Sequence, residues 1–279
     1  SIGGVFILIV EQTDRLVIGA FLPIEQVTRY SAAWKLYVLA FSVPTTLVQA
    51  LSPVLANLYG AGDMPRMRAA LYQMTKYSAA LAMPMVATLG LSSGWLLQIW
   101  LGPAFADLYI VVAVLVAGLA VTVLNHAGHS ALLAMGQVRR RLWTYDAPQA
   151  ILNLGLSLWL VGRLGIVGVA IGTFVPALLM QPIFLRLIFD SCGVTWTGWS
   201  RIAMTMGAAV SVAFLPAVAA RVALGPTSPV VFALCAVSSA AFFAWFWTRG
   251  LSLEERAWLV ARFPVVRRLG LGRGSAEPA

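Results

Sequence analysis

The stretch ILIVEQTDRLVIGA, residues 7–20, sets three ionisable side chains inside an apolar segment that runs from Ile2 to Leu22. Glu11, Asp14 and Arg15 stand at positions i, i+3 and i+4, so on a helix they share one face. Charged groups at membrane depth cost about 2.5–3.5 kcal/mol each on insertion scales, and they usually face a protein interior or a wet cavity. The rest of the chain decides whether this segment crosses a membrane and what its polar face meets.

The composition is that of a membrane protein. The chain has 279 residues, of which 60% are hydrophobic and 10% charged, and its mean hydropathy is +0.86. Soluble proteins carry about 25% charged residues, so a multi-pass membrane protein is expected. The chain starts at Ser1 without an initiator Met or a basic leader, so we expect a fragment of a longer protein. Cys192 and Cys235 lack the spacing of a disulfide or metal motif.

Eight apolar segments could cross a membrane as helices. None of them shows the alternating pattern of a membrane β-strand, so the sequence predicts an all-α, polytopic membrane helix bundle with eight transmembrane helices. Prolines at positions 44, 53, 84 and 216 should kink three of the helices, the second, third and seventh. The segments are residues 2–22, 36–58, 77–100, 108–135, 148–161, 166–188, 202–224 and 230–247.

The connections between these segments alternate in charge. Basic residues gather after the second, fourth and sixth segments and in the tail, whereas the other connections carry few. The positive-inside rule places basic connections in the cytoplasm, so we expect the C-terminus there. The net charge of +9 is then an orientation signal and not a sign of nucleic-acid binding. The basic group is Arg66, Arg68, Lys76, Arg139, Arg140, Arg141, Arg186, Arg201, Arg249, Arg256, Arg262, Arg267, Arg268 and Arg273.

Two local patterns predict helix contacts. Gly168 and Gly172 have the small-xxx-small spacing that lets two membrane helices approach closely. Ser252 and Glu255 form a capping-box pattern at the start of an amphipathic stretch, Leu251–Arg262. This stretch should lie as an interfacial helix on the inner leaflet.

Three groups of polar residues are candidates for a functional site. Glu11, Asp14 and Arg15 either line a cavity that binds a cation or an anionic substrate, or form an internal salt bridge, for which Glu11 and Arg15 are the natural pair. Two further groups stand in the fourth and fifth segments. Asn125, His126 and His129 could line a cavity, although hydrogen bonding at the helix end is the simpler interpretation, and Gln149 with Asn153 could face a cavity or serve packing.

The sequence contains no pattern typical of an enzyme site. It has no Gly-x-Ser-x-Gly, no P-loop and no His-Glu-x-x-His. The two histidines have no carboxylate or thiol nearby in sequence, so no metal site is predicted. We therefore do not expect an enzyme, although an integral-membrane glycan transferase, which can work with isolated Asp and Arg, stays open as an alternative.

Five stretches together resemble the polysaccharide flippases of the multidrug/oligosaccharidyl-lipid/polysaccharide exporter superfamily. Their order along the chain is similar to the order of that family's motifs from its seventh to its twelfth helix. The stretches are DRLVIGAFLP (residues 14–23), PVLA (53–56), LGPAF (101–105), LAMGQ (133–137) and GIVGVA (165–170). The resemblance implies the second lobe plus two extra helices of a fourteen-helix transporter.

This resemblance implies a domain division and a function. Residues 1–188 should form a six-helix lobe, residues 189–248 two additional transmembrane helices, and residues 249–279 a cytoplasmic interfacial helix and a disordered tail. The implied function is translocation of an undecaprenyl-pyrophosphate-linked oligosaccharide across the bacterial inner membrane for surface polysaccharide such as O-antigen, by alternating access. A cation-coupled multidrug exporter of the same superfamily is the alternative.

The resemblance also assigns roles to the candidate residues. Arg15 should bind the pyrophosphate, with Gln149 and Asn153 as further substrate-binding residues. Asp14 and Glu11 should carry a coupling H+ or Na+, and no other cofactor is expected. Asn125, His126 and His129 should line the cavity. The expected partners are the lipid-linked oligosaccharide, membrane lipid and other polysaccharide assembly proteins.

Overall fold

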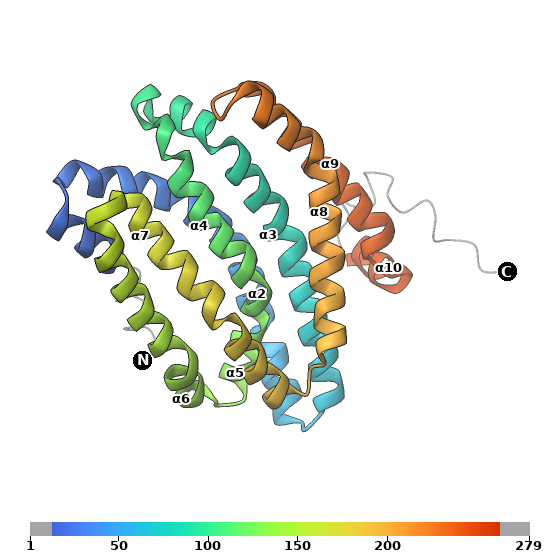
Figure 1. Ribbon diagram of the computed structural model, residues 1–279. Helices are drawn as coiled ribbons and strands as arrows, with labels where there is room; N and C mark the ends of the chain where they lie inside the picture. The colour runs from blue at the N-terminus through green and yellow to red at the C-terminus, as the bar shows by residue number, and fades with distance from the viewer. Residues whose placement is uncertain (1–12, 263–279) are drawn as a thin grey trace.

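The fold is all-α, as the sequence predicts. The computed structural model describes residues 13–262, with side chains to residue 257, and this part of the chain contains helices and no strand (Figure 1). A first helical segment covers residues 13–21. The elements that follow are α2 (Ile24–Gly60), α3 (Met64–Leu101), η1 (Pro103–Leu108), α4 (Tyr109–Thr122), η2 (Val123–Asn125), α5 (His126–Ala134), α6 (Val138–Arg141), η3 (Leu142–Asp146), α7 (Ala147–Cys192), α8 (Trp196–Leu224), α9 (Pro229–Trp245), η4 (Phe246–Gly250) and α10 (Leu253–Arg262).

Helix α3 holds the bundle together. It packs against α2 and α4 on one side and against α8 and α9 on the other, and α7 joins the bundle chiefly through α4 (Figure 1). The largest hydrophobic cluster follows this arrangement, with Ala79 and Leu97 of α3 beside Val112 and Leu119 of α4. Within the described residues, six helices are long and apolar enough to cross a membrane.

Helix α7 is a hairpin of two arms. Gly165 has φ 58° and ψ −139°, a conformation that L-residues rarely adopt, and the chain turns back there (Figure 1). The second arm approaches the first so closely that a Cβ on Gly168 would lie 2.5 Å from the carbonyl oxygen of Leu160. A Cβ on Gly172 would collide with Ser157. The predicted break between residues 161 and 166, and the predicted close approach at both glycines, are therefore confirmed.

Two helices begin earlier than the sequence predicts. Helix α2 begins at Ile24 and not at Leu36, and α3 begins at Met64 and not at Tyr77. Hydropathy detects only the apolar part of a helix, whereas these first turns are polar and lie beyond it. Asp63 caps α3 by accepting a hydrogen bond of 3.1 Å from the backbone N–H of Arg66. The apolar segment at residues 2–22 is described from residue 13 onward only.

The basic connections come together at one end of the bundle. The Nε of Arg68 at the start of α3 donates to the carbonyl oxygen of Cys192 at the end of α7, at 3.3 Å. At the same end, Arg140 lies 3.7 Å from the carboxylate of Asp190. The opposite end carries the bidentate pair between Arg29 and Asp107, at 2.6 Å. The alternation of charge along the chain thus corresponds to two ends of one bundle, while the domain division at residues 188 and 248 stays a prediction.

Helix α10 is fixed to α3 by one carboxylate. Glu255 accepts hydrogen bonds from Lys76 Nζ at 2.6 Å, from Tyr77 Oη at 2.7 Å and from the backbone N–H of Ser252 at 2.7 Å. The Ser252 hydroxyl accepts in return from the Glu255 N–H at 3.1 Å, so the predicted capping box is confirmed. Partial burial by itself would raise the pKa of Glu255, but these donors outweigh it, and the pKa lies below its usual value.

We expect Gly168→Ala to destabilise the α7 hairpin by about 1–3 kcal/mol, because the new methyl group meets backbone that cannot move aside. Unfolding in detergent can be followed with a thiol-reactive dye, since Cys192 and Cys235 are both free and buried. Gly155→Ala is the matched control, because a Cβ there meets open space. An equal melting temperature for the two variants would contradict the close approach of the arms.

We expect Glu255→Gln to loosen α10, because the half-buried Lys76 ammonium loses its counter-charge; the cost should be about 1–3 kcal/mol. Hydrogen exchange of the α10 amides measures this loosening, and Glu25→Gln, at an exposed glutamate near the start of α2, should leave the exchange unchanged. A lowered pKa means that this contribution is complete above the ordinary glutamate pKa and is lost as pH falls through the lowered value. Protection of α10 that stayed constant on strong acidification would contradict this role.

Candidate functional site

The carboxylate of Asp14 lies at the meeting point of three elements. Asp14 is only 2% exposed and stands in the first helical segment, residues 13–21. Its Oδ2 accepts a hydrogen bond of 2.6 Å from Tyr30 Oη of α2 and one of 2.9 Å from Thr173 Oγ1 of α7. A buried carboxylate needs such donors, because an unpaired charge away from water is very costly. Of the predicted polar face, Asp14 therefore points into the bundle.

The α7 hairpin brings Asn153 to the same place. Its Nδ2 donates to the Gly172 carbonyl oxygen at 3.2 Å and to Thr173 Oγ1 at 3.1 Å, across the two arms. Asn153 is 4% exposed, so this amide is as deeply placed as the carboxylate. The close packing at Gly172 makes the contact geometrically possible. Asp14 and Asn153, predicted from separate patterns, therefore belong to one network.

This network has an unused acceptor. Asp14 Oδ1 is buried and has no hydrogen-bond partner among the described residues. The Thr173 hydroxyl that donates to Oδ2 also lies 3.3 Å from the Val169 carbonyl oxygen. Carboxylate, hydroxyl and carbonyl oxygens suit a hard cation, and a single carboxylate can equally hold a proton.

Arg15 occupies the adjacent face of the same helix. The side chain is half-buried, and its Nε is buried without a hydrogen-bond partner in the described part of the chain. A guanidinium has five N–H donors in a planar fork that fits the oxygens of phosphate or carboxylate. Glu11, the predicted ion-pair partner of Arg15, lies outside the described residues. The ion pair between them therefore stays a prediction.

The three polar residues of the fourth segment, Asn125, His126 and His129, do not form one site in the structure. Asn125 and Gln181 exchange two hydrogen bonds, of 2.6 and 3.0 Å, between η2 and α7. His126 instead meets the Phe41 ring edge-on at 5.2 Å, and its Nδ1 is buried without a partner in the described structure. His129 packs on Phe184 at 4.3 Å between ring centroids. The two histidines therefore make aromatic contacts, and the hydrogen bonding predicted for this group is found at Asn125.

Gln149 is not part of the Asp14 network. It stands one turn before Asn153 on α7, is half-buried, and makes no side-chain hydrogen bond with the described residues. The structure therefore brings together two of the predicted residues, Asp14 and Asn153, with Arg15 beside them. It places Gln149, Asn125 and the histidines elsewhere.

Residues 2–110 match the family described as polysaccharide biosynthesis protein. The matched stretch contains Asp14, Arg15 and Tyr30, and therefore the first part of the buried network. Together with the apolar helices, the match supports a multi-pass membrane protein with a role in polysaccharide biosynthesis. No curated protein and no solved structure matches the chain.

Three residues of the polar interior escaped the sequence analysis. Tyr30 lies in the matched stretch, whereas Thr173 and Gln181 lie beyond it on the second arm of α7. Gln181 had a detectable signal, because it is the one amide in the apolar stretch 166–188. Tyr30 and Thr173 had none, since hydroxyl-bearing residues are common in membrane helices and only the fold shows that they meet Asp14.

Proposed function

We propose that this protein is a flippase that moves an undecaprenyl-pyrophosphate-linked oligosaccharide from the inner to the outer leaflet of the bacterial inner membrane. The observation that carries the proposal is the match of residues 2–110 to a polysaccharide biosynthesis family, which includes the Asp14–Arg15 pair. A protein of helices that are apolar along most of their length fits a transport role in that process better than a soluble synthetic one. The described helices would form one lobe of an alternating-access transporter, with α8 and α9 added to it.

Arg15 is the proposed contact for the pyrophosphate. Its guanidinium is half-buried, and the Nε is left without a protein partner in the described residues. Two phosphate oxygens can accept from such a fork at once, which gives both charge neutralisation and orientation. Because desolvation strengthens this contact, a half-buried Arg binds an anionic head group better than an exposed one.

Asp14 is the proposed coupling residue. Its free Oδ1 can take up H+ or Na+, and the bound charge would lower the cost of burying the carboxylate. With the ion bound, the hydrogen bonds of Asp14 to Tyr30 and Thr173 hold residues 13–21 against α2 and α7. Release of the ion leaves the charge compensated only by the two hydroxyl donors, and so favours an arrangement in which these elements separate or water enters. In this way one ion can bias the two states of the transporter.

The orientation follows from the basic end of the bundle. Arg68 and Arg140 lie at that end, and the positive-inside rule assigns it to the cytoplasm. Helix α10 lies at this end, and we propose that the C-terminus is cytoplasmic as well. The lipid-linked substrate would therefore enter near the end where the basic side chains gather, and other polysaccharide assembly proteins would deliver it there. No enzymatic step is part of the proposal.

Arg15→Ala should lower surface polysaccharide at least about tenfold, because a charge-assisted, bidentate contact is removed. The test expresses the intact protein in a bacterium that lacks its own copy, with membrane levels matched by immunoblot. Arg15→Lys should retain part of the export. Arg163→Ala is the matched control, since Arg163 packs on Trp159 near the turn of the hairpin. Normal export by Arg15→Ala would remove this residue from substrate binding.

Asp14→Asn should abolish the dependence of transport on the ion gradient, because the neutral amide cannot gain and lose a positive charge. The measurement is transport in membrane vesicles with imposed Na+ and pH gradients, applied separately so that the two ions are distinguished. Asp107→Asn, at the exposed partner of Arg29, is the control and should keep the wild-type dependence. A gradient dependence unchanged by Asp14→Asn would refute the coupling role.

A further inference from the structure

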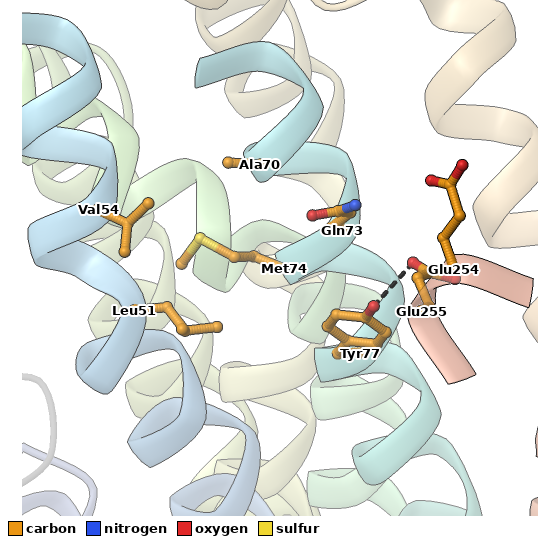
Figure 2. A pocket seen from close by; sticks show the side chains of 8 residues that line it. All are labelled: Leu51, Val54, Ala70, Gln73, Met74, Tyr77, Glu254 and Glu255. Atoms are coloured by element: carbon orange, nitrogen blue, oxygen red, sulfur yellow. Dashed lines mark hydrogen bonds between the residues drawn. The ribbon is translucent and has the colours of Figure 1, made fainter. Parts of the chain in front are cut away.

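A crevice of about 450 Å³ lies between α2, α3 and α10 (Figure 2). Leu51 and Val54 of α2 and Met74 of α3 form its apolar part. Gln73 and Glu254 contribute the polar groups. The crevice is separate from the Asp14 network, and neither substrate binding nor ion coupling uses its residues.

The crevice lies where the bundle enters the membrane. Helix α3 has 38 residues and so is about 57 Å long, well beyond the hydrocarbon core of about 30 Å. Its first turns therefore extend past the core, and α10 is bound at Lys76 and Tyr77, where the apolar part of α3 begins. An amphipathic helix at this level lies in the head-group region. An occupant from the membrane would have both an apolar and a polar part.

The polar side of the crevice carries one available negative charge. Glu255 is fully engaged by Lys76, Tyr77 and Ser252. Glu254 is exposed at the wall of the crevice and makes no ion pair with the described residues. Lys76 neutralises the neighbouring Glu255, so Glu254 is the carboxylate of the crevice without an ion pair in the described residues. It selects for a cationic group and against an anionic one.

We propose that the crevice binds an amine-headed phospholipid of the phosphatidylethanolamine class. An acyl chain would lie on Leu51, Val54 and Met74, and the ammonium would donate hydrogen bonds to the Glu254 carboxylate. Gln73 can donate from its amide to the phosphate of the same head group. A choline head group has the charge but no N–H donor, and a glycerol head group leaves the lipid anionic, so both should bind more weakly.

Lipid retention by the purified, intact protein tests this proposal. The protein is exchanged into nanodiscs that contain equal parts of phosphatidylethanolamine, phosphatidylcholine and phosphatidylglycerol, and tightly retained lipid is measured by native mass spectrometry. We expect preferential retention of phosphatidylethanolamine. Glu254→Gln should lower that retention about tenfold, as for loss of one hydrogen bond to a charged group. Glu25→Gln, at an exposed glutamate near the other end of α2, is the matched control.

A second variant tests the apolar part of the site. Ala70→Trp fills the crevice from α3 and should remove the retained lipid even with Glu254 intact. Equal retention of the three lipids, preference for phosphatidylglycerol, or unchanged retention in Glu254→Gln would each overturn the proposal. Because the readout is bound lipid, the result is independent of whether the protein transports an oligosaccharide.

Discussion

The buried carboxylate of Asp14 is the constraint on which the described bundle depends most. A charge this far from water must be compensated, and the compensation comes from Tyr30 on α2 and Thr173 on α7. These two helices otherwise have little contact, because α7 packs chiefly on α4. The carboxylate therefore joins elements that hydrophobic packing alone leaves apart. In the proposed function, an ion neutralises this same carboxylate. The packing of the helices and the proposed ion coupling would therefore both depend on the two carboxylate oxygens of Asp14.

The α7 hairpin explains how this compensation is possible. Gly165 lets the chain reverse, and Gly168 and Gly172 let the two arms approach until backbone meets backbone. Only at that separation does the Asn153 amide span both arms and reach Thr173. Glycine thus contributes to the polar site without supplying any polar group, since it sets the distance over which the hydrogen bonds can form.

Much of this fold could be predicted from the sequence, because membrane helices and helix caps leave local patterns. The apolar segments, the turn after residue 161, the glycine pair and the Ser252–Glu255 capping box are all signals over a few residues. The early starts of α2 and α3 could not be found this way, since polar turns outside the hydrocarbon carry no hydropathy signal. The partners of Asp14 could not be found either, because Thr173 is 159 residues away and only tertiary packing brings them together.

The attachment of α10 has a mechanical consequence for the described bundle. Helix α9 packs along α3, continues through η4 into α10, and α10 returns to α3 through Lys76 and Tyr77. The three helices therefore form a closed circuit, in which each is held to the next by packing, by the chain or by the ion pair. A displacement of the basic end of α3 would therefore be passed on to α9 and α10 together.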